Sequence, residues 1–240
     1  MFQKFHNRFD KYKTLHVAPR QYSGHELLHH LGLRPEAPVL VIQEDDARWR
    51  DERLGKIVCE EMARAAVAFG VSIVDQGIDV GLPGLLNTVL RERHHPGVFI
   101  GVASTTFELQ PQQPTDAPGI RLGDAHTHFV LVEGNGVGIE LPTMRALVHA
   151  LAEKTFYMLI SVRGGKALEE DENSERDPQK TSHYQGFTSS VTGISLQLRL
   201  SETPQKVSRE DFFSLNDLYA EPEKPANRIR HYMRTFMEIK

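Results

Sequence analysis

The first half of the chain alternates short runs of consecutive apolar residues with longer amphipathic stretches. The apolar runs are Val39–Ile42, Val71–Val74 and Val98–Val102, and the amphipathic stretches between them are Leu54–Phe69 and Leu82–Arg91. Apolar runs without polar alternation are typical of parallel strands covered on both faces, and the amphipathic stretches predict helices. Right-handed crossovers between such strands build a three-layer, Rossmann-like sheet. We therefore predict an α/β fold with a parallel sheet.

A second block of the chain repeats this pattern. Phe129–Val132 predicts a strand, and after a glycine-rich turn a helix is expected from near Pro142 to about Glu153. A further strand is expected over Phe156–Val162. Proline suits the first helical turn because the backbone N–H that it lacks has no partner there. The predicted core domain spans residues 38–168.

Residues 1–37 are expected to form a basic amphipathic arm and a short helix. The arm carries basic side chains and has aromatic residues at roughly helical spacing, namely Phe2, Phe5, Phe9 and Tyr12. Such an arm either lies on a membrane surface or a partner, or packs its aromatic residues against its own domain or a second subunit. Ser23 and Glu26 then form a capping-box pattern, and Gly32 supplies a stop, which predicts a short helix.

The C-terminal part of the chain is predicted to hold a linker and an appendage. Residues 169–190 form the polar linker or loop, because their first half is acidic and nearly free of apolar side chains. Residues 191–240 form the appendage of a strand and helices. Its strand is predicted from apolar residues that alternate with polar ones and would form one buried face, namely Ile194, Leu196, Leu198 and Leu200.

Two helices are expected after this strand. Ser208 and Asp211 match a helix-opening pattern, and Pro222 and Pro225 would close that helix. Residues 227–240 have apolar side chains on one side of a second helix and arginines elsewhere, which indicates packing or partner binding. Oligomerisation into a homo-oligomer through the terminal helices follows as a hypothesis.

The composition places the chain among ordinary globular proteins. It has 240 residues, of which 40% are apolar and 25% charged, and a formal net charge of −4. Cys59 is the only cysteine, which excludes an internal disulfide framework and suits a reducing compartment. No apolar run approaches the roughly 20 residues that a membrane-spanning helix needs, and the start of the chain lacks a signal-peptide pattern. We expect a cytoplasmic protein, and the absence of an overall basic charge predicts no nucleic-acid partner.

Candidate site residues follow the predicted strands, because parallel α/β sheets bind ligands beyond the carboxyl ends of their strands. Two of these loops are rich in glycine. Glycines at a strand-to-helix turn let backbone N–H groups approach a phosphate, although tight turns need glycines in any protein. The candidates for ligand binding are Gly77, Asp79, Gly81, Ser104, Thr105, Gly134, Asn135, Gly136, Gly138 and Glu140.

His126 and His128 are the best-spaced pair among the twelve histidines. Residues two apart on a strand point to the same face, so both imidazoles would face one site. A third metal ligand is not evident, and the spacing alone does not define a zinc site. We therefore predict no bound metal here and expect the pair to enter the central strand and shape the loop around a ligand.

The block around these histidines resembles the signature of a known family. Residues 123–134 read GDAHTHFVLVEG and are followed by Gly138-Ile139-Glu140, which is similar to the pattern N-H-T-H-F-x-L-V-x-G with a later G-x-E in the LSDAT family. That family is the branch of the SLOG superfamily that includes the cytosolic N-terminal region of melastatin-type TRP channels and prokaryotic relatives. Residues 74–81 resemble the family's D-G-G-T-x-x-G turn, Gly101–Ala103 its G-V-A strand end, and residues 161–165 its closing N-G-G turn.

The resemblance covers about residues 38–165 and implies a Rossmann-like, SLOG-type fold. It also implies a nucleotide-derived ligand, ADP-ribose or an NAD-related molecule, bound mostly for sensing, with a membrane or defence effector as partner. Residues 77–81 would form one phosphate-facing turn and residues 134–140 the other. Gln76 and Ile78 depart from the family pattern, in which a glycine and a threonine stand. The first loop, Glu44–Asp46, is acidic and would repel a pyrophosphate unless a divalent cation such as Mg²⁺ or an arginine intervened.

Two alternatives to a sensor remain open. The wider superfamily includes phosphoribohydrolases that resemble P-G-G-x-G-T-x-x-E, and a glycosidic cleavage needs a carboxylate under the sugar ring, a role that Glu140 would fill. The turn lacks the proline and the threonine of that pattern, and Glu140 would otherwise cap the following helix. The second alternative is a scaffold protein with a degenerate pocket. We lean towards a protein that is not an enzyme.

Overall fold

The computed structural model describes residues 13–35, 37–44, 52–79, 81–93, 97–105, 122–123, 125–134, 138–163, 193–200 and 207–237. The strands are β1 (Lys13–Val17), β2 (Val39–Glu44), β3 (Ser72–Asp75), β4 (Phe99–Ser104), β5 (His128–Val132), β6 (Phe156–Arg163), β7 (Gly193–Leu200) and β8 (Val207–Ser214). The helices are α1 (Gly24–Leu31), α2 (Glu52–Phe69), α3 (Gly81–Glu92), α5 (Leu141–Leu151), α6 (Leu215–Ala220) and α7 (Lys224–Met237).

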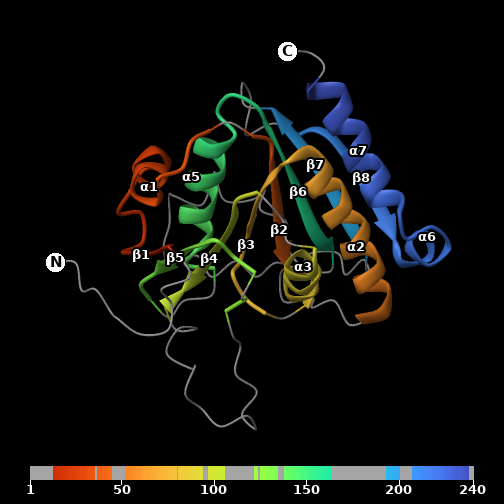
Figure 1. The fold of residues 1–240 in the computed structure, drawn as a ribbon, viewed down its shortest axis with the longest axis horizontal. Helices are drawn as coiled ribbons and strands as arrows, with labels where there is room; N and C mark the ends of the chain where they lie inside the picture. Colours follow the sequence, from red (N-terminus) through yellow and green to blue (C-terminus); the bar gives the residue numbers. More distant parts are fainter. Residues whose placement is uncertain are drawn as a thin grey trace, which may run out of the picture.

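The strands form one eight-stranded sheet in the order β1-β5-β4-β3-β2-β6-β7-β8 (Figure 1). The pairs from β1 to β6 are parallel, and β7 and β8 add to the β6 edge in antiparallel pairing. The sheet is therefore α/β and mostly parallel, which confirms the predicted fold class. The chain passes from β2 to β5 in one direction and then returns across β2 to β6, so the strand order reverses between β2 and β6.

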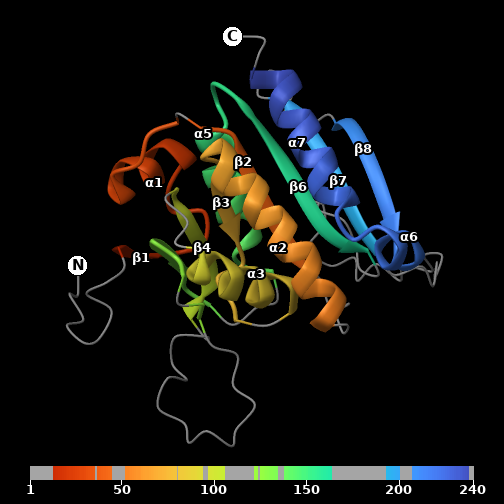
Figure 2. The same ribbon diagram turned by 45° about the vertical axis from the view of Figure 1, so that its right-hand side comes forward.

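Helices cover both faces of the sheet and divide the core into two parts. On one face, α1 and α5 pack through buried residues such as Leu27 and Leu147. On the other face, α2, α3 and α7 pack through residues such as Met62, Leu86 and Ile229. Figure 2 shows α2 and α7 side by side, and an ion pair between Arg230 and Glu61 joins them at 2.9 Å. None of the helices that the structure describes is both long and apolar enough to cross a membrane.

The N-terminal region differs in part from the predicted arm. Lys13–Val17 is the edge strand β1, which pairs in parallel with β5. This strand has only five residues, and three of its side chains are exposed, so its sequence carries little apolar pattern. Pairing with β5, rather than local sequence, makes this segment a strand. The aromatic positions 2–12 lie outside the described residues. Helix α1 confirms the capping-box prediction, since Ser23 and Glu26 cap each other's backbone and Gly32 ends the helix at φ 71°.

The strand predicted at 194–200 is present as β7, but both of its faces are buried. Ile194, Leu196 and Leu198 face the core beside α2 and α7. The intervening polar residues Ser195, Gln197 and Arg199 are also buried, although they point to the opposite face of the sheet. Glu210 of β8 accepts hydrogen bonds from Ser195 and Gln197, which offsets the cost of burying them.

The helix predicted to open at Ser208 is wrong. Residues 207–214 form β8, antiparallel to β7, and the same S-x-x-D pattern recurs at Ser214 and Asp217, where a complete capping box opens α6. Pro222 follows α6, but Pro225 lies in the first turn of α7, where proline is tolerated. A capping pattern marks sites at which a helix can start, and strand pairing decided between the two copies.

Candidate ligand site

The carboxyl ends of β3, β4 and β5 carry the turns predicted to bind a ligand. Four glycines in these turns have positive φ angles, a backbone conformation that other residues adopt only with strain: Gly77 (69°), Gly81 (61°), Gly134 (133°) and Gly138 (75°). Two of them lie at or near the start of a helix, since α3 begins at Gly81 and α5 begins three residues after Gly138. The glycines are therefore required by the backbone path of the turns whether or not a ligand binds.

The turn after β3 lies directly on β4, where the backbone of Gly77 packs against that of Gly101. Asp75 Oδ1 accepts the Gly77 N–H at 2.7 Å, and Gly77 O accepts the Gly123 N–H at 3.0 Å. Ile78 forms an isolated antiparallel bridge with Leu122, so a second segment holds the turn from its other side. The turn is thus fixed by contacts within the protein.

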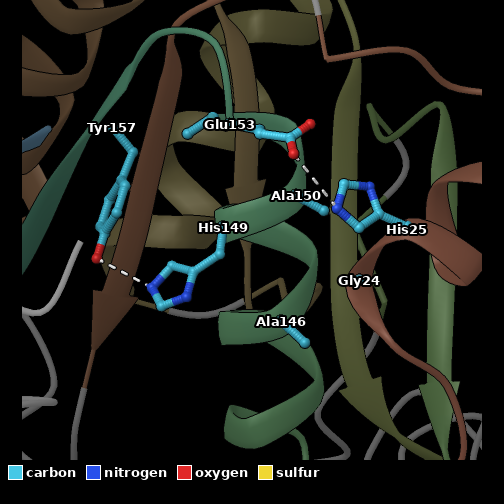
Figure 3. A pocket seen from close by; sticks show the side chains of 8 residues that line it. Gly24, His25, Ala146, His149, Ala150, Glu153 and Tyr157 are labelled. Atoms are coloured by element: carbon cyan, nitrogen blue, oxygen red, sulfur yellow. Dashed lines mark hydrogen bonds and ion pairs between the residues drawn. The ribbon is translucent and has the colours of Figure 1, made fainter. Parts of the chain in front are cut away.

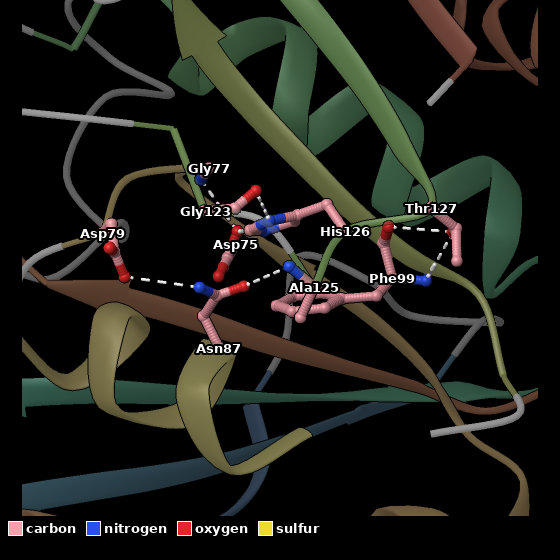
Figure 4. Close-up of polar contacts among 9 residues, drawn as sticks. All are labelled: Asp75, Gly77, Asp79, Asn87, Phe99, Gly123, Ala125, His126 and Thr127. Carbon is pink, nitrogen blue, oxygen red and sulfur yellow. Dashed lines mark hydrogen bonds and ion pairs between the residues drawn. The ribbon is translucent and has the colours of Figure 1, made fainter. Parts of the chain in front are cut away.

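A buried histidine–aspartate pair lies under this turn (Figure 4). His126 Nε2 is 2.7 Å from Asp75 Oδ1, and both side chains have an exposed fraction of 0%. His126 Nδ1 is 3.0 Å from the carbonyl oxygen of Gly123. The imidazole stacks on the Phe99 ring with centroids 3.9 Å apart, and the Phe129 ring lies 4.8 Å away. His126 therefore lies in the interior of the protein beneath the turn, out of reach of solvent.

Asn87 of α3 ties the two segments of this wall together. Its Nδ2 donates to Asp79 Oδ1 at 3.3 Å, and its Oδ1 accepts the Ala125 N–H at 2.8 Å. Sequence analysis missed Asn87 and the partnership of Asp75. The only signal for Asn87 was a polar residue on the apolar face of a predicted helix, and it is 1% exposed.

The two glycine turns meet at the carboxyl edge. The Gln76 side chain hydrogen-bonds the Glu140 carboxylate, and the Ser104 hydroxyl at the end of β4 donates to the carbonyl of Gly134. Residues from the ends of β3, β4 and β5 are thereby joined into one site. Gln76, which departs from the family pattern, is the residue that makes the contact between the turns.

Glu140 is a buried carboxylic acid at this contact, with 8% of its surface exposed. Burial raises the pKa of Glu140 above its ordinary value, while hydrogen bonds from its own backbone and from Gln76 act in the opposite direction. Glu140 is the N-cap residue of α5, as the alternative of a helix cap expected, but its side chain makes no capping hydrogen bond. The carboxyl group is hydrogen-bonded to the Gln76 side chain of the other turn.

His128 lies at the other end of β5 from this junction. His128 is the first residue of the strand and interacts with Lys13 and the backbone of Leu31, whereas His126 packs on the rings of Phe99 and Phe129. The two imidazoles therefore do not face one site. His128 Nδ1 is 2.8 Å from the Thr127 hydroxyl, and burial and the charge of Lys13 lower its pKa. Strand β5 is also next to the sheet edge rather than central. The structure therefore separates the predicted histidine pair.

The remaining candidates are placed as follows. Thr105 directly follows β4 and is half-buried, and Asp79 is exposed at the turn before α3. Asn135, Gly136 and the acidic positions 45–46 lie outside the described residues. Within the described ranges no group of three or more His, Cys, Asp or Glu side chains could hold a metal ion. Binding of Mg²⁺ stays a prediction.

A separate cavity of about 310 Å³ lies between α1 and α5 (Figure 3). In it, His25 lies 3.6 Å from Glu153, and the Tyr157 hydroxyl lies 3.4 Å from His149 Nε2. Its other lining residues are small, namely Gly24, Ala146, Ala150 and Ala152. None of the residues predicted to bind the ligand lines this cavity.

The comparison with protein families decides what kind of domain carries this site. A family model described as "SLOG in TRPM, prokaryote" matches residues 37–175, which is more than half of the chain. The chain belongs to this family. The matched range of this LSDAT-type SLOG domain runs from before β2 to beyond β6 and contains both glycine turns. Membership is consistent with a domain that binds a nucleotide-related ligand. The comparison with curated proteins finds no match.

Proposed function

We propose that this SLOG-family protein binds ADP-ribose or an NAD-related nucleotide at the carboxyl edge, between residues 76–81 and 134–140, and acts as a ligand sensor. The observation that carries the proposal is the contact of the two glycine turns through Gln76 and Glu140. Two turns that touch at the carboxyl edge of a parallel sheet can hold the two ends of one ligand. Separate turns would bind only fragments.

The chemistry of this edge suits a phosphorylated sugar. Helices α3 and α5 start at the two turns, so the positive ends of their dipoles and the free N–H groups of their first residues are available to phosphates. The buried carboxyl of Glu140 is an acceptor for ribose hydroxyl groups. The ligand's phosphates would thus lie against backbone groups and its sugar against Glu140.

Sensing follows if the ligand binds one arrangement of the turns better than another, because differential affinity is what shifts a conformational equilibrium. Helix α5 runs from the second turn into the packing with α1, and β6 continues the sheet to β7 and β8. A change at the turns would reach surfaces that contact an effector, a membrane protein or a second copy of the chain.

A second candidate function is N-glycosidic hydrolysis, and the state of Glu140 favours it. Burial raises the pKa of Glu140, which makes its carboxyl a better proton donor to a leaving base than an exposed glutamate would be. Gln76 opposes this function, because its hydrogen bond already engages the carboxylate.

A thermal-shift screen followed by chromatography separates these functions. The probes are ADP-ribose, NAD, AMP and cyclic AMP, each with and without Mg²⁺, and a specific binder raises the melting temperature by mass action. Recovery of intact ligand supports the sensor, and release of free base and sugar phosphate supports the hydrolase. A screen in which no probe shifts the melting temperature refutes nucleotide binding and favours the scaffold.

Two glutamine variants sharpen the screen. Glu140→Gln keeps the size of the side chain and removes its charge, and we expect weaker ADP-ribose binding. Glu153→Gln makes the same change just beyond the other end of α5, where the side chain is 51% exposed beside His25, and we expect unchanged binding. Equal affinities for the two variants would refute a role for Glu140.

A further inference from the structure

His126 and Asp75 are fully buried, so neither side chain can touch a ligand in this structure. Both nevertheless stand in the segments that carry the family signature. Asp75 accepts the Gly77 N–H in the turn after β3, residues 76–79, which we call the ligand turn. His126 bonds Asp75 and the Gly123 carbonyl. The pair can therefore act on the site through the ligand turn.

The imidazole of His126 is held through both of its ring nitrogens. The carbonyl of Gly123 can only accept, so His126 Nδ1 donates to it at 3.0 Å. His126 Nε2 is hydrogen-bonded to Asp75 Oδ1 at 2.7 Å. The rings of Phe99 and Phe129 pack against the imidazole. These contacts fix both the position and the orientation of the His126 ring.

All hydrogen bonds of the Asp75 carboxylate within the described residues pass through one oxygen. Oδ1 is hydrogen-bonded to His126 Nε2 and accepts the Gly77 N–H, while Oδ2 is buried without a hydrogen-bond partner there. His126 therefore orients the carboxylate, and the carboxylate in turn holds the amide side of Gly77, whose carbonyl is hydrogen-bonded to Gly123. Gln76 lies between Asp75 and Gly77 in the chain, so the same contacts set where its side chain reaches.

We propose that His126 is a positioning residue of the ligand site, which acts through Asp75 and the Gly77 amide to hold Gln76 against Glu140. This inference rests on the proposed ligand site. Removing the link between His126 and Asp75 frees the carboxylate to turn, releases the Gly77 amide and lets the two glycine turns separate. The ligand then has to restore their arrangement when it binds, which lowers its affinity.

Two substitutions of His126 distinguish positioning from packing. The amide of His126→Asn lies near the place of Nδ1, so it can donate to Gly123 O but does not reach Asp75. The longer side chain of His126→Gln places its amide near Nε2 and keeps the donor to Asp75. Both variants lose the stacked ring, so both are expected to melt at a lower temperature.

Calorimetric titration with ADP-ribose is the first measurement. We expect His126→Asn to lower affinity at least tenfold and His126→Gln to stay within threefold of the wild type. Leu147→Val, a buried change in the core beneath α5, is the control for lost stability and should leave affinity unchanged. An equal loss in the two His126 variants would overturn the proposal.

Nuclear magnetic resonance tests the pair without a ligand. We expect the Gly77 amide to be protected from hydrogen exchange in the wild type and in His126→Gln but not in His126→Asn. Equal protection in all three proteins would overturn the positioning role. If the wild type binds none of the nucleotide probes, the proposed function fails, and these spectra still decide whether the pair holds the turn.

Discussion

Gly101 of β4 and Gly77 of the ligand turn touch backbone to backbone. A Cβ atom on Gly101 would lie 2.7 Å from Gly77 Cα and 2.6 Å from Cε1 of Phe129. Real Cβ atoms do not approach other atoms so closely, so the turn can lie on the strand only because neither residue has a side chain. The sheet itself thus forms the floor on which the ligand turn rests.

Gly101→Ala should displace this turn. We expect a loss of about 1–3 kcal/mol in the free energy of unfolding, the usual cost of overpacking, and a clear loss of ADP-ribose affinity. Chemical denaturation and calorimetric titration measure the two effects. Gly70→Ala is the matched control, because its Cβ would meet nothing within 4 Å and it costs only the positive φ of 58°. Unchanged affinity in Gly101→Ala would contradict the close packing.

Glu140→Gln should separate stability from binding. A carboxyl whose pKa is raised in the folded protein contributes stability below its ordinary value of 4.5 and loses that contribution as the pH rises through the folded value. Above that value the wild type has a buried charge, and the variant does not. We expect the variant to melt no lower than the wild type at pH 8 and to lose any advantage near pH 4. Melting temperatures across this range check the sign, and a variant less stable at pH 8 would refute it.

Tyr232 should titrate late. Burial and the hydrogen bond that its hydroxyl donates to Asp211 raise the pKa of Tyr232 to about 12. Since the folded value lies above the ordinary value of 10, the contribution of this group to stability is complete below pH 10 and is lost as the pH rises through about 12. The difference in ultraviolet absorbance between wild type and Tyr232→Phe isolates its titration. In Asp211→Asn we expect a smaller shift, with the part due to burial retained.

The first helix should depend on its cap. Ser23 Oγ accepts the Glu26 N–H, and the Glu26 carboxylate accepts the Ser23 N–H at 2.8 Å. Ser23→Ala removes one half of this exchange and should lower the free energy of unfolding by about 1 kcal/mol. Ser23→Asp, which keeps an acceptor at the cap, should recover most of the loss. Equal destabilisation by the two substitutions would show that the loss does not come from the missing acceptor at the cap.

The pattern of apolar residues predicted every strand and helix that the structure describes between residues 38 and 163. Those elements are continuous apolar or amphipathic stretches, so local sequence determines them. Strands β1 and β8 were missed, because Lys13–Val17 and Val207–Ser214 are rich in polar residues and become strands by pairing with β5 and β7. Strand pairing between distant segments leaves little trace in local sequence.

For the candidate site, the sequence located the turns but not the contacts between them. The rule that ligands bind at the carboxyl ends of parallel strands located both glycine turns, but it could not show that Gln76 meets Glu140 or that Asp75 meets His126. Those pairs are separated by 64 and 51 positions, and their meeting depends on how far each strand extends. Strand β3 ends at Asp75, which pairs with Gly101 in the middle of β4, so the turn after β3 lies over β4 rather than beyond its end.

The packing of Gly24 against α5 has a consequence for how the protein can move. A Cβ on Gly24 would lie 2.0 Å from the carbonyl oxygen of Ala146, so α1 and α5 are in backbone contact and cannot slide past each other freely. Helix α5 starts next to Glu140, and α1 follows β1 after a short loop. A shift of Glu140 along the axis of α5 would therefore push directly on α1 through this backbone contact.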